Sequence, residues 1–136
     1  MSADPLLELG KQILAQQPFS TLLGTELTMF TADQAELQLP MRPELKQQHG
    51  FAHGGVLSYL ADNALTFAGG AALAGDVVTG EYKINYLRPA TGNTLVARAK
   101  VLRAGKVHAV CQCEVFAVTS EGEKLCAFAL GTINKR

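Results

Sequence analysis

Residues 53–73 read HGGVLSYLADNALTFAGGAAL, and this segment decides the fold that the rest of the chain must build. Apolar residues occupy nearly every side of a helix drawn through it, so such a helix must be enclosed on most of its surface. At 1.5 Å per residue it would be about 30 Å long. Asp62 is the one charged residue between His53 and Asp76. The segment therefore predicts a central helix that carries a single carboxylate among core residues.

Strand-like segments lie on both sides of this helix. After it, four such segments separated by short turns span residues 77–88, 94–103, 106–118 and 124–133. In the third, every second residue from Val107 to Ala117 is small and apolar, which suits a face packed against a helix. Before the helix, residues 25–40 alternate as a hairpin that turns near Asp33, and residues 5–16 have the leucine spacing of a short amphipathic helix.

One enclosed helix with long antiparallel strands predicts an α+β fold, in which a curved antiparallel sheet wraps around the helix. The 136 residues have room for one domain, residues 1–136, and we expect residues 1–18 to form a helical lid. Long strands leave an edge and a face of the sheet open. We therefore expect a homodimer, or a dimer of dimers, that covers them.

Composition excludes several classes of partner. Twelve Lys and Arg balance twelve Asp and Glu, so the charge favours neither nucleic acid nor an anionic membrane. Residues 1–5 show no secretory signal and no membrane span is visible, which predicts a cytoplasmic protein. In a reducing cytoplasm Cys111, Cys113 and Cys126 should be free thiols. No set of metal ligands has a recognisable spacing, so no metal is expected.

Asp62 is costly to bury unless it is paired or functional. Thr66 lies one turn further along the same helix face, and Ser58 or Tyr59 lies one turn before, which gives a narrow polar stripe on an apolar helix. One interpretation is a functional carboxylate. The other is a helix with one solvent-exposed side, on which Asp62 faces solvent or accepts a hydrogen bond from a neighbouring backbone amide.

The tripeptide His53-Gly54-Gly55 stands where the helix begins, and first-turn backbone N–H groups have no partner inside a helix. Glycine at 54 and 55 lets a ligand approach them, so they can hold an anion or a developing oxyanion. Alternatively, the glycines only permit a tight entry turn with His53 as a cap. Gly54 and Asp62 are eight residues apart, about 12 Å along the axis. If they act on one carbonyl, they come from different subunits of an antiparallel dimer.

The run from His53 to Ala64, HGGVLSYLADNA, resembles the signature of the hotdog-fold acyl-CoA thioesterases, specifically the PaaI-like group of phenylacetate degradation. The run YLRPA from Tyr86 to Ala90 matches the same group, and the resemblance covers roughly residue 19 to the C-terminus. It implies a hotdog fold, in which the sheet wraps the helix as a bun wraps a sausage. It also implies that Asp62 is the catalytic carboxylate, that the Gly54 amide forms the oxyanion hole, and that His53 supports the loop.

The resemblance extends to further positions. Gln47 stands where the family often has Asn, and there it would orient the thioester carbonyl or a water molecule. Thr66 and Thr79 match positions where a hydroxyl helps to hold the attacking water, although either could serve packing alone. The basic residues near strand ends could meet the phosphates of CoA or could simply be solvated, and they are Arg88, Arg103 and Lys106.

The resemblance thus implies an acyl-CoA thioesterase that needs no metal or redox cofactor, with CoA present as part of the substrate. Asp62 would act as general base or as nucleophile, and the sequence leaves both roles open. It also leaves open the length of the acyl chain and the choice between aryl and alkyl groups. Two alternatives remain, namely a hotdog dehydratase or hydratase and a non-catalytic protein that binds acyl-CoA.

Overall fold

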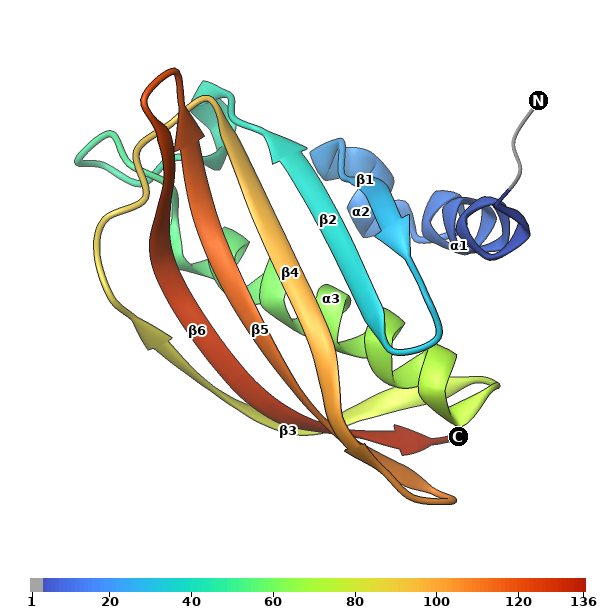
Figure 1. The fold of residues 1–136 in the computed structure, drawn as a ribbon. Helices are drawn as coiled ribbons and strands as arrows, with labels where there is room; N and C mark the ends of the chain where they lie inside the picture. The colour runs from blue at the N-terminus through green and yellow to red at the C-terminus, as the bar shows by residue number, and fades with distance from the viewer. Residues whose placement is uncertain (1–3) are drawn as a thin grey trace.

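Helix α3 (Gly54–Leu73) lies along the concave face of a six-stranded antiparallel sheet in the computed structural model, which describes residues 4–136 (Figure 1). The strands follow the spatial order β1-β2-β4-β5-β6-β3. They are β1 (Glu26–Phe30), β2 (Gln34–Pro40), β3 (Val77–Tyr86), β4 (Thr94–Ala104), β5 (His108–Thr119) and β6 (Gly122–Lys135). The predicted α+β fold, with a sheet wrapped around one central helix, is confirmed.

Small side chains let the sheet approach the helix closely. On β5 the predicted inner face is buried at Ala109, Cys111, Cys113, Val115 and Ala117, whereas Val107 lies before the strand and is exposed. On α3 the side chains of Leu60, Ala64 and Leu65 are fully buried. A Cβ atom added to Gly69 would lie 2.7 Å from the Cβ of Ile133, so at this point only glycine allows the helix to meet β6.

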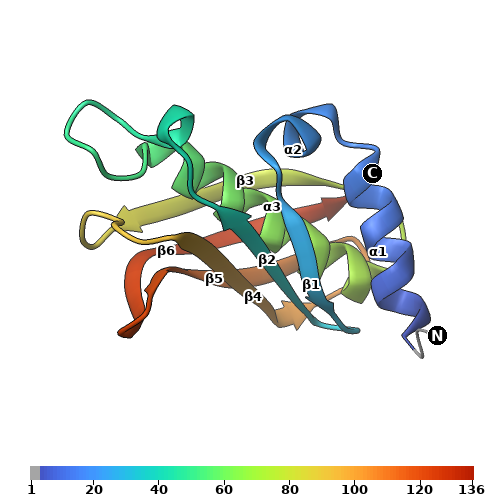
Figure 2. The ribbon, with the colours of Figure 1, turned by 90° about the horizontal axis from the view of Figure 1, so that it is seen from above.

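The segment before the hairpin forms two helices, α1 (Pro5–Ala15) and α2 (Pro18–Leu23) (Figure 2). The first confirms the predicted amphipathic helix, and the side chain of Asp4 caps it by accepting a hydrogen bond from Leu7 N–H at 3.1 Å. The second was not predicted. Residues 1–3 of the expected lid lie outside the described residues, and a one-turn 3₁₀ helix, η1 (Pro43–Leu45), precedes the loop to α3.

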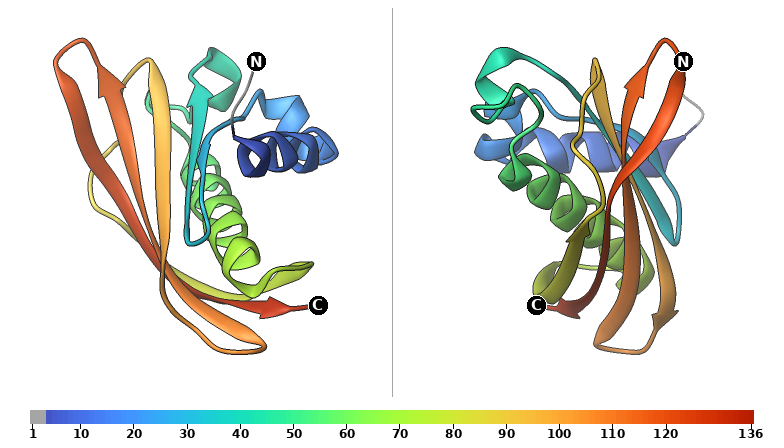
Figure 3. Two further views of the ribbon diagram at one scale, coloured as in Figure 1. Left: turned by 45° about the vertical axis from the view of Figure 1, so that its right-hand side comes forward. Right: turned by 90° about the vertical axis from the view of Figure 1, so that its left-hand side faces the viewer.

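The two edges of the sheet differ in what lies beside them. Helix α1 packs on β1, where Gly10 permits close contact with Leu27 and Phe30, so this edge is flanked by the N-terminal helices (Figure 3). Strand β3 forms the other edge and pairs only with β6 among residues 4–136. An unpaired edge of ten residues is a template for a further strand.

None of the helices formed by residues 4–136 is both long and apolar enough to cross a membrane.

Candidate functional site

The predicted polar stripe on α3 faces strand β3. Thr79 Oγ1 donates a hydrogen bond of 2.6 Å to Asp62 Oδ1, and the hydroxyls of Ser58 and Tyr82 are 2.5 Å apart. Thr66 Oγ1 donates to the backbone carbonyl of Asp62 at 2.7 Å and lies 3.2 Å from Thr79 Oγ1. Asp62 is therefore half-buried and hydrogen-bonded, which differs from the interpretation in which it merely faces solvent or a backbone amide.

A bulge in β3 allows both Thr79 and Tyr82 to point at the helix. The pairing of β3 with β6 shifts register between Thr79 and Glu81, so Gly80 is an extra residue. Without it, residues 79 and 82 would point to opposite faces of the sheet. A Cβ atom at Gly80 would lie 2.6 Å from Asn134 Nδ2, so a larger residue here would require the Asn134 side chain to move.

Asp62 presents one fixed oxygen and one free oxygen. Thr79 occupies Oδ1, while Oδ2 has no hydrogen-bond partner among residues 4–136. The carboxylate borders a hollow of about 470 Å³, the Asp62 pocket, which is also lined by Phe19, Tyr59 and Thr66. A carboxylate that is held by one oxygen and open at the other can accept a proton from water or attack an electrophile.

The start of α3 offers one free backbone donor. His53 caps the helix, because its Nδ1 accepts a hydrogen bond of 2.8 Å from Gly55 N–H. The amides of Val56 and Leu57 bond to the His53 carbonyl, at 2.9 and 3.4 Å. Within the part of the chain that the structure describes, only the N–H of Gly54 is left without a partner in this turn. The first turn can therefore offer this amide to an oxyanion.

Gly54 lies in a second hollow of about 420 Å³, the Gly54 pocket, together with Gln47 and Arg88. Gln47 Oε1 accepts a short hydrogen bond from the backbone N–H of His49, and its Nε2 is unpaired among residues 4–136. Tyr86 covers the pocket and donates to the Gly54 carbonyl at 3.2 Å. His53 N–H also bonds to the Leu45 carbonyl at 2.9 Å, which ties the loop to the helix.

The structure does not bring the Asp62 and Gly54 pockets together within one chain. Both residues lie on α3, eight positions apart, which is about 12 Å along a straight helix. Their pockets share no lining residue. Asp62, Thr66 and Thr79 thus form one half-site, and Gln47, His53 and Gly54 form another, with Gly55 serving the cap of the helix.

The three predicted phosphate-binding residues are not a cluster in one chain. Arg88 follows β3, whereas Arg103 and Lys106 lie at the turn between β4 and β5, and these two connections are at opposite ends of the sheet (Figure 1). Strand β4, which separates them, has 11 residues and spans about 35 Å. Only Arg88 borders the Gly54 pocket.

A buried polar network beside Asp62 was not predicted. Ser20 is 2% exposed, and its hydroxyl contacts Gln17 Oε1 at 2.6 Å and the Tyr59 hydroxyl at 2.5 Å. Asn63 Nδ2 donates to Gln17 Oε1 at 3.0 Å. The network fastens α2 to the middle of α3. The sequence signal was Asn63, a polar residue directly after Asp62 that lies outside the predicted stripe of Ser58, Asp62 and Thr66.

In residues 4–136 no three His, Cys, Asp or Glu side chains lie close enough to hold a metal ion.

Comparisons with known proteins identify the family to which the chain belongs. The pattern of the thioesterase superfamily matches residues 49–124, which contain α3 and most of the sheet. A thioesterase family protein from Silicibacter pomeroyi is 31% identical, with a TM-score of 0.86 over 90% of this chain and 92% of that one. The medium/long-chain acyl-CoA thioesterase YigI of Escherichia coli is 26% identical over 85% of this chain and 86% of its own.

The fold itself is shared with PaaI of Escherichia coli, a protein from the phenylacetic acid degradation operon. That structure has a TM-score of 0.82 over 95% of this chain and 91% of its own, at 24% identity, a level that shows the fold alone. The superfamily match covers more than half of the chain and includes Gly54, Asp62, Thr66 and Thr79. The chain therefore belongs to the thioesterase superfamily, and it is a thioester hydrolase with the hotdog fold.

Proposed function

We propose that the protein hydrolyses acyl-CoA thioesters in sites shared between two subunits, each built from Asp62 of one chain and Gly54 of the other. The observation that carries this proposal is the pair of incomplete half-sites on one helix. Asp62 has a free carboxylate oxygen, and Gly54 has a free N–H, yet about 12 Å of helix separates them. Neither group alone can both polarise a thioester and deliver water to it.

A two-fold dimer through β3 would complete the sites. Strand β3 has a free edge, and the polar stripe of α3 lies directly beneath it. Pairing two β3 strands antiparallel would extend the sheet and set the two α3 helices side by side in opposite directions. Gly54 of the partner subunit would then lie near Asp62. A dimer of two such dimers remains compatible with this arrangement.

In the proposed reaction, backbone and side-chain groups of the two subunits polarise the thioester and activate water. The thioester oxygen accepts a hydrogen bond from Gly54 N–H, and the unpaired Gln47 Nε2 supplies a second donor to the carbonyl or to the water. Asp62 takes a proton from water as the water oxygen attacks the carbonyl carbon. When the C–S bond breaks, the sulfur of CoA leaves with that proton, and the products are a free acid and CoA. Thr66 and Thr79 hold the carboxylate and the water.

In a second route, Asp62 Oδ2 attacks the carbonyl carbon, the C–S bond breaks, and CoA leaves as its thiolate from a mixed anhydride. Water then hydrolyses the anhydride to the free acid and the Asp62 carboxylate, and the proton that water releases goes to the CoA thiolate. Neither route uses a redox cofactor, because thioester hydrolysis changes no oxidation state, and neither assigns a step to a metal; CoA takes part only as part of the substrate. Acyl-CoA as the substrate is supported by the similarity to YigI, a medium/long-chain acyl-CoA thioesterase, at 26% identity.

We place the reaction in the cytoplasm. We assign it to one domain, residues 1–136, with residues 1–18 as a lid and with Arg88, Arg103 and Lys106 as candidates for phosphate contacts.

The test is release of CoA from a panel of acyl-CoA thioesters, measured with a thiol reagent for the wild type and for Asp62→Ala. We expect turnover by the wild type and a loss of about 10²- to 10⁴-fold in the variant. No turnover on any member would overturn the enzyme assignment. Binding without hydrolysis would indicate a non-catalytic acyl-CoA binder, and loss of water from a 3-hydroxyacyl thioester would indicate a dehydratase.

Single turnover in ¹⁸O-labelled water separates the two roles of Asp62. A mixed anhydride places label in the protein carboxylate on those turnovers in which water attacks the Asp62 carbonyl carbon, whereas general-base catalysis leaves the protein unlabelled on every turnover.

A further inference from the structure

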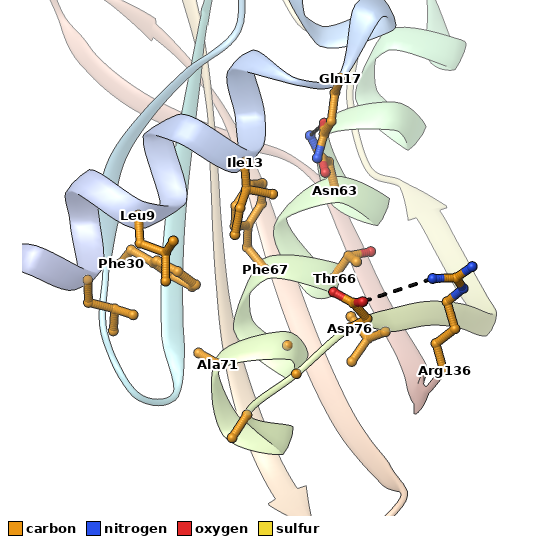
Figure 4. A pocket seen from close by; sticks show the side chains of 15 residues that line it. Leu9, Ile13, Gln17, Phe30, Asn63, Thr66, Phe67, Ala71, Asp76 and Arg136 are labelled. Atoms are coloured by element: carbon orange, nitrogen blue, oxygen red, sulfur yellow. Dashed lines mark hydrogen bonds and ion pairs between the residues drawn. The ribbon is translucent and has the colours of Figure 1, made fainter.

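A hollow of about 770 Å³ lies between α1 and α3, and we call it the α1–α3 pocket. Figure 4 shows Leu9 and Ile13 of α1 facing Phe67 of α3, with Phe30 of β1 behind them. Helix α1 packs mainly on β1, and a hollow remains between α1 and α3. The volume is in the range that small-molecule ligands occupy in proteins, roughly 300 to 1,000 Å³.

The α1–α3 pocket adjoins the Asp62 pocket. Gln17, Asn63 and Thr66 line both of them. The hydrogen bond of 3.0 Å between Asn63 Nδ2 and Gln17 Oε1 marks the end at which the two meet. Polar side chains therefore gather where a thioester carbonyl would react, and the walls beyond them become apolar.

The pocket is long in one direction. Its residues on α3 run from Asn63 to Ala71, eight positions, or about 12 Å of helix, and Ala74 lines it just beyond the end of the helix. The side chains of Leu9 and Ile13 are 51% and 42% exposed, although both face the hollow. At the far end, Asp76 and Arg136 form an exposed ion pair at 3.9 Å. A single aromatic ring would fill only part of such a channel, whereas an extended alkyl chain would cover the exposed leucine and isoleucine.

We propose that the α1–α3 pocket is the subsite for the acyl chain, and that it takes a linear alkyl chain of medium length in preference to an aryl group. This inference rests on the proposed function, because it uses Asp62 as the reacting end of the channel. It also gives α1 a specific role, since α1 forms one wall of the subsite. Each methylene that enters an apolar wall should strengthen binding about fourfold until the pocket is full.

The test compares straight-chain thioesters from butyryl-CoA to palmitoyl-CoA and phenylacetyl-CoA, by kcat/KM. Ala71→Leu and Ile13→Trp place extra carbon in the pocket from opposite walls. We expect each variant to lower kcat/KM for dodecanoyl-CoA by about tenfold more than it lowers kcat/KM for butyryl-CoA. Gln12→Trp is the matched control, because Gln12 is exposed on the same helix and does not line the pocket.

Binding of non-hydrolysable alkyl-CoA thioethers, measured by calorimetry, separates failure of the subsite from failure of the enzyme. One outcome is that the wild type does not hydrolyse thioesters but binds long thioethers more tightly than short ones, and that Ile13→Trp removes this gain in affinity. That outcome would support the acyl-chain subsite and contradict the proposed hydrolysis. If hydrolysis occurs but phenylacetyl-CoA is preferred, or both filling variants keep the wild-type profile of chain length, the subsite is overturned. A change of oligomeric state in Ile13→Trp but not in Gln12→Trp would mark the hollow as a contact between copies and would also overturn it.

Discussion

Thr79 Oγ1 and Asp62 Oδ1 are joined by a hydrogen bond of 2.6 Å, which ties the edge strand of the sheet to the middle of the central helix. This bond fixes the orientation of the carboxylate and leaves its second oxygen toward the Asp62 pocket. The position of the hydroxyl depends on the bulge at Gly80, so the geometry of β3 controls the geometry of the half-site.

Replacing Thr79 by valine should therefore lower kcat by roughly tenfold to a hundredfold, since a hydrogen bond to a charged group contributes about 1.5–3 kcal/mol. KM should change little, because Thr79 orients the acid and does not need to touch CoA. Thr79→Ser keeps the hydroxyl and should recover most of the rate. Steady-state kinetics on all three proteins checks this, and equal kcat values for valine and serine would show that Thr79 serves packing alone.

Gly54 offers a separate test of its backbone amide. It occupies the first position of α3, where proline is tolerated, and His53 before it is extended, at φ −62° and ψ 136°. Gly54→Pro should thus remove the free N–H without breaking the helix, and kcat should fall by about 10²- to 10³-fold. Gly54→Ala keeps the N–H, and its Cβ would lie 3.5 Å from the ring of Tyr86, an ordinary contact.

Circular dichroism and thermal unfolding of both variants control for folding. If Gly54→Pro is folded and as active as Gly54→Ala, the amide is not part of the oxyanion hole.

The sequence predicted those elements whose pattern is local. The enclosed helix, the hairpin turning near Asp33 and the four later strands follow from periodicity and turn residues, and each is present with ends shifted by a few residues. Helix α2 was missed because six residues are too few for a period to show, and its stability comes from contacts distant in sequence. Arg42, for example, bonds to the carbonyls of Leu22 and Leu23, at 3.0 and 2.9 Å.

For the site, the sequence predicted which residues share a helix face but not how β3 meets them. Ser58, Asp62 and Thr66 lie on one stripe as expected. The bulge was missed although Gly80 inside a strand is a signal for one. The phosphate-binding set joined residues that are near strand ends in sequence, although the length of the strand predicted at residues 94–103 already separates Arg88 from Arg103 and Lys106. Register and strand order depend on long-range pairing, which no local pattern contains.

The three cysteines should not react in the folded protein. Cys111, Cys113 and Cys126 are buried free thiols. Burial raises the pKa of Cys111 to about 11, and it also raises the pKa of Cys113 and of Cys126. Because the thiolate is the reactive form, a thiol reagent at pH 8 should label none of them in native buffer and all three in denaturant. Rapid labelling of a thiol without denaturant would contradict the burial of these side chains.

Acid should weaken the fold partly through Glu36. Burial alone would raise its pKa, but hydrogen bonds from Arg98, Thr28 and Gln38 outweigh burial and hold the pKa below its ordinary value. Hydrogen bonds from the same Arg98 lower the pKa of Glu123. The stabilisation is therefore complete above the ordinary glutamate pKa and is lost as pH falls through the lowered values.

Glu36→Gln tests this pH dependence, measured as the free energy of unfolding in urea at pH 7 and at pH 3.5. The wild type should lose more stability between these pH values than the variant, by up to about 1 kcal/mol, since the partner Arg98 is partly exposed. An equal loss in the two proteins would mean that the ion pair does not contribute.

The most direct test of shared sites mixes two inactive proteins. Asp62→Asn and Gly54→Pro chains, each nearly inactive alone, are unfolded together and refolded so that subunits exchange, and hydrolysis of acyl-CoA is then measured. Sites built across two subunits give each mixed dimer one intact site, so activity should return to about a quarter of wild type. If the mixed dimers form, as a tag on one chain can verify, and activity stays at the level of the separate variants, Asp62 and Gly54 do not act across subunits.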